Sequence, residues 1–346
     1  MAEASIALFR DSELLREGKG LLIADESFDL SGISARDNIR YITNRKDIDH
    51  ALEVIGFDGN LSDFELESAP DEYFDFILFR LNKVKVLTHY LLESAARILK
   101  VGGSLILTGN NQEGIKSVIK HAEKMGSLAE LELLGKGLRY ARIIKEGGKT
   151  FDLKGDEYRQ FLEIRDEVQD LTFISKPGIY GYKKIDEGSR FLAETLNSDP
   201  FALEGKVLDL GCGYGYLAAS VGKNSKIEQL VATDCNVAAV QLAAHNLESM
   251  GIEALVTLDD CGSELEDRSF DRIICNPPFH QGFGTSKELT VKFVENSKRL
   301  LRRRGIAYFV VNKFLAIEEV CYAQYVKATE IASNNHFKIL KLERVK

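Results

Sequence analysis

The sequence predicts an α/β protein made of two tandem domains, each built on a doubly wound, mostly parallel sheet. The chain has 346 residues, which is too long for one ordinary hydrophobic core and suits two. Short apolar stretches alternate with amphipathic stretches of helix length, as expected where helices cover both faces of a parallel sheet. Strand-like sequences of the first half return in the second half, which indicates an internal duplication.

The duplication covers three separated pairs of segments. These are Phe74–Leu78 with Phe270–Ile274, Leu99–Leu107 with Leu301–Phe309, and Leu138–Ile144 with His336–Leu342. Asp75 and Asp271 are 196 positions apart, Leu99 and Leu301 are 202 apart, and Tyr140 and Phe337 are 197 apart, so the offset varies by only six positions. Chance similarity between ordinary strands is the alternative explanation.

In the second half, the predicted elements alternate in the order of a doubly wound sheet. The expected strands are Val207–Leu210, Gln229–Thr233, Arg272–Cys275 and Ala307–Val311, and the expected helices are Gly215–Gly222, Val237–Met250 and Leu289–Leu301. Residues 147–172 are polar and charge-dense, so we expect a linker there, with a short helix around Tyr158–Val168. The predicted domains are therefore residues 1–146 and 173–346.

The composition excludes several classes of protein. Hydrophobic residues make up 45% of the chain, enough to form packed cores, which argues against global disorder. No apolar run reaches the roughly 18 residues of a membrane span, and the N-terminus lacks a secretion signal, so we expect a cytoplasmic protein. The cysteines have no metal-binding spacing, and we expect reduced thiols and no metal site. They are Cys212, Cys235, Cys261, Cys275 and Cys321.

Charge is unevenly distributed along the chain. The net charge of −8 argues against a protein that coats nucleic acid nonspecifically. Residues 1–70 hold 7 basic and 15 acidic residues, whereas residues 281–346 hold 13 basic and 6 acidic residues. A basic surface near the C-terminus is therefore available for phosphates, although an ordinary solvated surface would have the same composition.

A glycine-rich loop follows the first strand of the second half. It has the form D-x-G-x-G-x-G, with Asp209, Gly211, Cys212, Gly213 and Gly215, and it lacks the G-x-G-x-x-G spacing of dinucleotide sites. An acidic residue beside the loop would repel a pyrophosphate, but it suits the cationic amino-acid end of S-adenosylmethionine. The loop therefore predicts a site for this methyl donor, and a structural glycine turn is the alternative.

Two further acids are expected in the same site. Asp234 ends the next strand, 19 residues beyond Gly215, where its carboxylate can accept both ribose hydroxyls. Asp260 ends the third strand and is expected to accept from the adenine amine, with Asp259 as a substitute.

The sequence Asn276-Pro277-Pro278-Phe279 supplies the predicted chemistry. The lone pair of an amine on a planar base is conjugated with the ring, which makes that amine a poor nucleophile. If the Asn276 side-chain oxygen and the Pro277 carbonyl accept its hydrogens, the pyramidal and more nucleophilic form is favoured. Phe279 is expected to stack on the base. A rigid Pro-Pro turn with a core Phe is the alternative.

The chain resembles the RsmC/RlmG family of ribosomal RNA guanine-N2 methyltransferases almost from end to end. The resemblance rests on Asn276–His280, on the D-x-G-x-G-x-G loop and on Pro177–Ser189. It implies two tandem Rossmann-like methyltransferase domains, of which the N-terminal one is degenerate and holds no cofactor. His280 narrows the choice among N-P-P-[FY] enzymes and is expected to position the base. Asp186 and Gly188 are expected to cover the cofactor, although the segment lacks the first glycine of the family pattern.

By the same resemblance, the N-terminal domain helps to recognise RNA. It has Asp25–Gly32 and Arg80–Lys83 where the glycine loop and N-P-P-F would stand, so it cannot carry out the same chemistry. Basic residues in both halves could contact RNA phosphates, although they could equally be ordinary solvated side chains. The candidate phosphate contacts are Arg80, Lys83, Lys85, Arg302, Arg303 and Arg304.

The predicted function is methyl transfer to guanine N2 in ribosomal RNA by a monomer acting on rRNA or a ribosomal subunit. Length and layout favour a small-subunit target, whereas the ending Asn334–Leu340 resembles the large-subunit member. A protein-glutamine or adenine-N6 methyltransferase is the main alternative, because those substrates also present a planar amine. An RNA-binding assembly factor without turnover is the non-enzymatic alternative.

Overall fold

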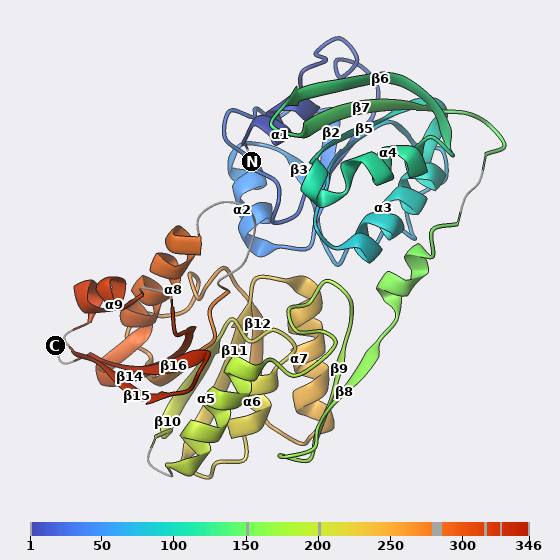
Figure 1. Cartoon of the computed structure of the whole chain (residues 1–346). Coiled ribbons are helices and arrows are strands. Elements are labelled where there is room, and N and C mark those ends of the chain that lie inside the picture. Colours follow the sequence, from blue (N-terminus) through green and yellow to red (C-terminus); the bar gives the residue numbers. More distant parts are fainter. Residues whose placement is uncertain are drawn as a thin grey trace. The chain divides into compact units, whose positions relative to one another are not determined.

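A computed structural model describes residues 2–149, 152–199, 202–278, 286–314, 317–325 and 327–344. The chain divides into two compact units, Met1–Gln160 and Phe161–Lys346. Figure 1 shows the first unit in blue to green and the second in light green to red. Within the described part of the chain, no helix is long and apolar enough to cross a membrane.

The first unit contains a seven-stranded sheet with the order β3-β2-β1-β4-β5-β7-β6. Its strands are β1 (Gly20–Ile23), β2 (Ile39–Thr43), β3 (Asp58–Leu61), β4 (Phe74–Arg80), β5 (Leu99–Asn110), β6 (Gly126–Gly135) and β7 (Leu138–Lys145). Its helices are α1 (Ala2–Leu8), α2 (Lys46–Val54), α3 (Lys85–Ile98) and α4 (Ile115–Ala122), with 3-10 turns η1 (Asn111–Glu113) and η2 (Gly155–Arg159). Strand β7 is antiparallel to both of its neighbours, whereas the pairings among β1 to β5 are parallel.

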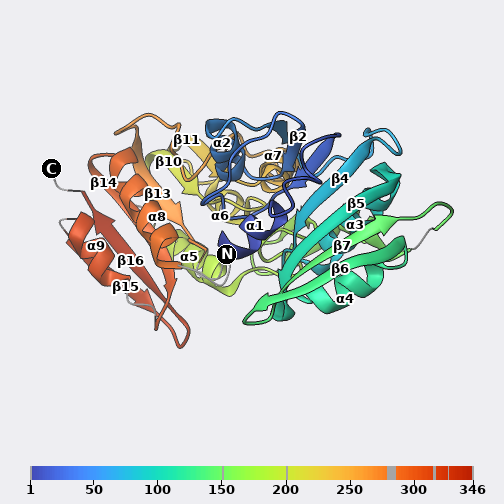
Figure 2. The same ribbon diagram turned by 90° about the horizontal axis from the view of Figure 1, so that it is seen from above.

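The second unit repeats this arrangement, with the order β12-β11-β10-β13-β14-β16-β15. Its sheet strands are β10 (Gly205–Leu210), β11 (Ile227–Asp234), β12 (Leu255–Leu258), β13 (Phe270–Cys275), β14 (Leu301–Asn312), β15 (Lys327–Ser333) and β16 (Phe337–Glu343). Its helices are α5 (Glu187–Ser198), α6 (Tyr216–Val221), α7 (Val237–Ser249), α8 (Ser286–Leu300) and α9 (Glu318–Gln324). The two sheets therefore share one topology, and Figure 2 shows the long antiparallel pair that ends each of them.

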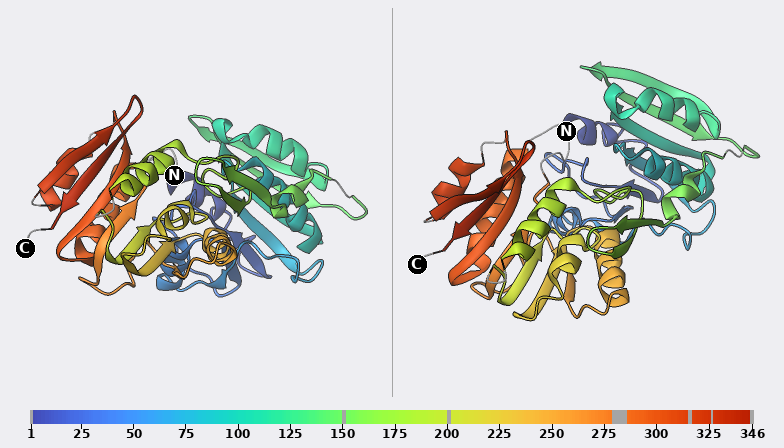
Figure 3. Two further views of the ribbon diagram at one scale, coloured as in Figure 1. Left: turned by 90° about the horizontal axis from the view of Figure 1, so that it is seen from below. Right: turned by 60° about the horizontal axis from the view of Figure 1, so that its bottom comes forward.

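Alternate residues of the central strands enter cores on opposite faces of each sheet. In β13, Ile274 packs with α5, α6 and α7, whereas Ile273 and Cys275 pack with α8 and α9. In β4, Leu78 packs with α1 and α2, whereas Ile77 packs with α3 and α4. Helices thus cover both faces of each sheet, as Figure 3 shows, and the predicted doubly wound architecture is confirmed.

The internal duplication extends to individual contacts. Asp75 and Asp271 occupy the same position at the start of β4 and β13. The carboxylate of Asp75 accepts a hydrogen bond from the backbone N–H of Lys19 at 2.8 Å, and that of Asp271 accepts one from Lys206 at 2.9 Å. The shared strand order and this shared contact agree with the duplication and argue against chance similarity.

The segment between the predicted domains is structured. η2 belongs to the first unit, and the second unit begins with an antiparallel hairpin of β8 (Leu162–Asp166) and β9 (Leu171–Ser175). The helix predicted around Tyr158–Val168 is therefore wrong. The sequence there is only loosely amphipathic, so pairing between β8 and β9 outweighs its helical tendency.

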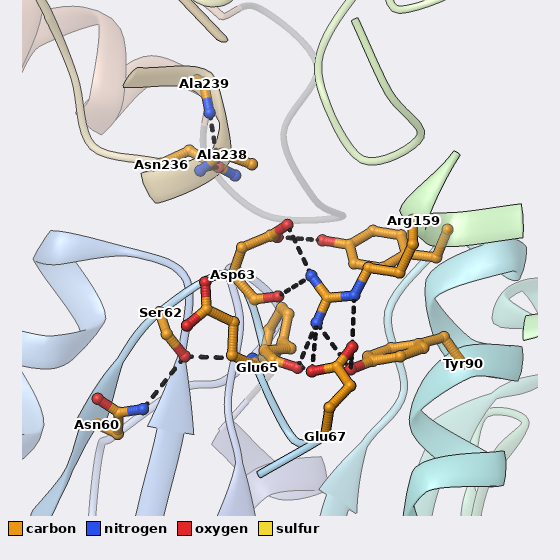
Figure 4. A network of polar contacts seen from close by, with 12 residues as sticks. Asn60, Ser62, Asp63, Glu65, Glu67, Tyr90, Arg159, Asn236, Ala238 and Ala239 are labelled. Carbon is orange, nitrogen blue, oxygen red and sulfur yellow. Dashed lines mark hydrogen bonds and ion pairs between the residues drawn. The ribbon is translucent and has the colours of Figure 1, made fainter. Parts of the chain in front are cut away.

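Arg159 fastens η2 to the first unit (Figure 4). Its guanidinium donates to the backbone oxygens of Asp63 and Phe64, both at 2.9 Å, and to the Tyr90 hydroxyl at 2.7 Å. It also pairs with the Glu67 carboxylate at 2.9 Å. These contacts hold the last turn of the first unit against α3, next to the boundary at residue 160.

The position of Arg80 does not support the predicted phosphate contact. Its side chain is only 2% exposed, and its two terminal nitrogens donate to the two carboxylate oxygens of Glu113, each at 2.7 Å. Because the guanidinium is buried and both of its terminal nitrogens are engaged, Arg80 cannot reach a phosphate at the surface. Arg80 is therefore a structural residue, while Lys83 and Lys85 are exposed.

Candidate active site

The glycine-rich loop joins β10 to α6 at the carboxyl edge of the second sheet. Gly211, Gly213 and Gly215 have φ angles of 82°, 56° and 91°, in the left-handed region that favours glycine. The backbone N–H groups of Gly211 and Cys212 donate to Thr233 in β11, both at 2.9 Å. Apart from its two chain neighbours, no described residue has an atom within 4 Å of where a side chain on Gly213 would begin. The loop is thus anchored to β11 on one side and leaves open space at Gly213 on the other.

Asp234 ends β11 directly beside this loop. One carboxylate oxygen accepts from the backbone N–H of Gly213, and the other accepts from that of Asn236, both at 2.9 Å. The acid predicted to bind a ribose is therefore fixed against the middle glycine of the loop. Asn236 in turn caps α7 by accepting from the N–H groups of Ala238 and Ala239.

Asp209 is fully buried beneath the same loop. One of its oxygens accepts from the backbone N–H of Ala218 at 2.9 Å, and the other has no hydrogen-bond partner. Burial raises the pKa of this carboxyl from its ordinary value of 3.8 to about 7. An orphaned buried oxygen of this kind is suited to a cationic group that enters the site.

This raised pKa has a testable consequence for stability. A group whose pKa is higher in the folded state stabilises the fold below its unfolded pKa, and this contribution is lost as the pH rises to about 7. Without cofactor, the parent chain should therefore lose free energy of unfolding relative to Asp209→Asn as the pH rises from 4 to 7. Urea unfolding at several pH values measures this difference, and parallel profiles would contradict a neutral buried Asp209.

Asp259 and Asp260 follow β12 at the same edge. The side chain of Asp260 is partly exposed and pairs with Lys292 of α8. The Asp259 carboxylate is buried and accepts from the Ser263 hydroxyl at 3.0 Å and from the backbone N–H of Glu264. Because these contacts occupy Asp259, it is a poor substitute for Asp260 toward an adenine amine.

Asn276 directly follows β13, and its side-chain amide has a fixed direction. The amide nitrogen donates to the Asp186 carboxylate and to the Ser189 hydroxyl, both at 2.8 Å. Asp186 also caps α5 by accepting from the Ser189 backbone N–H at 2.8 Å. A carboxylate can only accept, so the amide nitrogen faces Asp186 and the amide oxygen faces the opposite way.

Tyr180 completes this chain of contacts. Its hydroxyl donates to the second oxygen of Asp186 at 3.0 Å. Partial burial of the hydroxyl and the nearby Asp186 carboxylate raise the pKa of Tyr180 to about 12, so the phenol stays protonated as a donor. The sequence placed Asp186 over the cofactor, whereas the structure also gives it a role in orienting Asn276.

Two residues that support the glycine loop were not predicted from the sequence. The buried Asn246 of α7 exchanges two hydrogen bonds with the backbone of Ile174 in β9 and donates to the Tyr214 carbonyl at 2.8 Å. The buried Asp166 of β8 accepts from the Tyr216 hydroxyl at 2.7 Å. Together they brace both sides of the glycine loop against the β8–β9 hairpin. Neither residue belongs to a recognisable short motif, so no local signal in the sequence reports these contacts.

The remaining predicted residues of the site belong to the N-P-P-F-H segment and to α5. Pro277 and Pro278 follow Asn276 directly, whereas Phe279 and His280 lie outside the described residues. Gly188 lies in the first turn of α5. Among the described residues, no group of three or more His, Cys, Asp or Glu side chains is placed to hold a metal ion.

The arginine cluster lies at the start of β14. Arg302, Arg303 and Arg304 are all exposed, and Arg302 pairs with Asp271 at 2.8 Å. Their role as phosphate contacts stays a prediction.

Comparison with known proteins identifies the family. The family model "Methyltransferase small domain" matches residues 170–341, and "Methyltransferase small domain N-terminal" matches residues 5–132. The ribosomal RNA small subunit methyltransferase C of Shewanella halifaxensis is 30% identical over 271 residues, covering 78% of this chain and 77% of the relative. The chain belongs to the ribosomal RNA small subunit methyltransferase C family. The Shewanella amazonensis member is 28% identical over 342 residues and 98% of each chain.

A solved structure of this family has the same fold. The T. thermophilus 16S rRNA N2 G1207 methyltransferase (RsmC), in complex with AdoMet and guanosine, matches with a TM-score of 0.78. It is 24% identical, and the match covers 97% of this chain and 92% of that one. The predicted tandem arrangement of two Rossmann-like domains is thereby confirmed across both units.

The second unit of this family member fits S-adenosylmethionine. The open glycine loop, the orphaned oxygen of Asp209 and the carboxylate of Asp234 offer contacts for the carboxylate of the amino-acid end, for its cationic amine and for the ribose. In the first unit, Ala24 and Asp25 follow β1 in place of a glycine loop, and β2 ends in Thr43 where β11 ends in Asp234. Bound S-adenosylmethionine supplies an electrophilic methyl group.

We expect each chain to bind one S-adenosylmethionine, with Asp234 as a main contact. Asp234→Ala should weaken binding by about 1–3 kcal/mol, because charge-assisted hydrogen bonds to the ribose are lost. Isothermal titration calorimetry of the full chain measures both stoichiometry and affinity. Two sites per chain, or unchanged affinity of the variant, would contradict this assignment.

Proposed function

We propose that the chain transfers a methyl group from S-adenosylmethionine to the exocyclic N2 of a guanine in small-subunit ribosomal RNA. The observation that carries this proposal is the direction of the Asn276 amide. Asp186 and Ser189 engage its nitrogen, so its oxygen is the group left to meet the substrate. Such an oxygen selects a target that donates hydrogens, as an exocyclic amine does.

The chain's own residues would activate this amine by accepting its hydrogens. The carboxylate of Asp186 polarises the Asn276 amide, which makes the amide oxygen a stronger acceptor. Hydrogen bonds to that oxygen favour the pyramidal amine, whose lone pair forms the new N–C bond as the S–C bond breaks. The amine proton becomes acidic once the nitrogen carries the methyl group, so it can leave to solvent without a strong general base.

The choice of guanine and ribosomal RNA rests on the family. Adenine and glutamine also present planar amines, and the geometry of Asn276 alone suits all three. The relatives named above act, by their names, on small-subunit ribosomal RNA, and the T. thermophilus structure was solved with guanosine. These names favour guanine in the small subunit over the large-subunit, adenine and glutamine alternatives. We further propose that the chain acts as a monomer in the cytoplasm.

A substrate comparison tests the proposal. The purified chain is incubated with labelled S-adenosylmethionine and either ribosomal RNA, small ribosomal subunits or a release-factor protein. We expect label in RNA or subunits and none in the protein. Label in the release factor alone would establish the glutamine alternative, and binding of cofactor without any transfer would favour an assembly factor.

A further inference from the structure

Two large aromatic side chains stand exposed at the edge that carries Asn276. Tyr180 is 66% exposed although its hydroxyl is held by Asp186, and Phe314 is 83% exposed. Phe314 lies two residues beyond β14, which runs parallel to β13 with Phe309 opposite Cys275. Asn276 and Phe314 therefore follow neighbouring strands at the same carboxyl edge of the sheet.

Each ring stands on an ordered backbone. Tyr180 lies between Ile179 and Ile185, both of which are 5% exposed and packed in the core of the second unit. The backbone N–H of Phe314 donates to the Asn312 side chain at 3.0 Å. A ring whose backbone is already fixed loses little conformational entropy when a ligand stacks on it.

Two basic side chains lie on the same surface. The backbone N–H of Lys313 donates to the carbonyl of His336 at 2.8 Å, and the Lys313 ammonium donates to that of Asn334 at 3.1 Å. These bonds join the end of β14 to the turn before β16. Lys313 and His336 are both exposed.

Gly188 connects the turn before β16 to the site around Asn276. A Cβ on Gly188 would stand 3.1 Å from the ring of Phe337, the residue after His336, and 3.1 Å from the Asp186 carboxylate. Gly188 thus joins the β16 turn on one side to Asp186, the partner of both Asn276 and Tyr180, on the other.

We propose that Tyr180, Lys313, Phe314 and His336 form a rim that holds the nucleotides flanking the target guanine. This inference rests on the proposed function. A base inside a helix cannot reach Asn276, so the target must be unpaired or flipped out, and its neighbours then lose stacking partners. The two rings replace that stacking, and the two basic side chains meet the phosphates between the bases. Aromatic platforms beside cations are the usual way to bind single strands.

Steady-state methylation of ribosomal RNA by the full chain tests the rim. Phe314→Ala should raise the KM for RNA about tenfold, whereas the affinity for S-adenosylmethionine measured by calorimetry stays unchanged. Tyr180→Ala should raise the KM for RNA as well, whereas Tyr180→Phe, which loses only the hydrogen bond to Asp186 and keeps the ring, should retain the parent KM. Phe314→Tyr should retain the parent KM, because the aromatic face survives. Lys313→Ala should reduce the slope of log KM against log salt concentration by about one.

Leu255→Ala and Lys223→Ala are the matched controls. Leu255 is an exposed apolar residue at the amino end of β12, and Lys223 precedes the amino end of β11, so both belong to the opposite edge. Both controls should keep the parent KM and salt dependence. An unchanged RNA KM in Phe314→Ala and Tyr180→Ala would overturn the rim, as would an equal loss of cofactor affinity in Phe314→Ala. If the parent chain itself fails to methylate RNA, the proposed function fails instead.

Discussion

Asn276→Ala should lower the single-turnover rate of rRNA methylation by about 10²–10³ while leaving the affinity for S-adenosylmethionine almost unchanged. Removal of one oriented hydrogen-bond partner from a desolvated active site commonly has an effect of this size. The loss should fall on kcat, because the Asn276 oxygen acts on the amine as the methyl group is transferred. Rapid-quench experiments at saturating cofactor and RNA measure this rate directly.

Two further variants show whether the direction of the amide matters. Ser189→Ala removes one of the two acceptors that orient Asn276 and should lower the rate by about tenfold, a smaller effect than loss of the amide itself. Asn197→Ala changes an exposed asparagine at the far end of α5 and should have the parent rate. A parent-like rate for Asn276→Ala would mean that the amine is activated by another group.

Arg80→Ala should destabilise the first unit by about 3–5 kcal/mol, because it leaves the buried carboxylate of Glu113 without its partner. Urea unfolding of the full chain, followed by hydrogen exchange in β4 and β5, measures this change and assigns it to the first unit. If Arg80 instead contacted RNA, the variant would keep its stability and lose RNA affinity.

The double variant Arg80→Met with Glu113→Leu shows whether the stability depends on the buried charges themselves or on the packed volume of the two side chains. Apolar residues of similar volume often replace a buried pair at little cost, so the double variant should recover most of the stability lost in Arg80→Ala. A double variant as unstable as the sum of the two single variants would contradict this account of the pair.

The sequence predicted the elements of the fold whose signals are local. Alternating apolar strands and amphipathic helices were enough for two doubly wound sheets, and the nearly constant offset revealed their duplication. Short spacings also predicted a glycine loop beside Asp234, and the two are hydrogen-bonded in the structure, while their role toward the cofactor stays a prediction. The hairpin of β8 and β9 was not, since pairing between strands depends on contacts that a single segment does not contain.

The functions of Arg80 and Asp186 could not be assigned from sequence for a related reason. Arg80 stands where the catalytic copy has Asn276, and only the fold brings Glu113, 33 positions away, to its guanidinium. Asp186 caps α5 through the backbone N–H of Ser189, a contact between residues only three positions apart. Its bond to Asn276 spans 90 positions, and no local pattern reports it.

Nucleoside analysis tests the central claim most directly. Small-subunit ribosomal RNA lacking the modification is incubated with S-adenosylmethionine and either the parent chain or Asn276→Ala, then digested and analysed by mass spectrometry. We predict N2-methylguanosine at a single position with the parent chain, and almost none in the same time with the variant. A methyl group found instead on adenine N6, or equal yields of N2-methylguanosine from both proteins, would contradict the assigned chemistry.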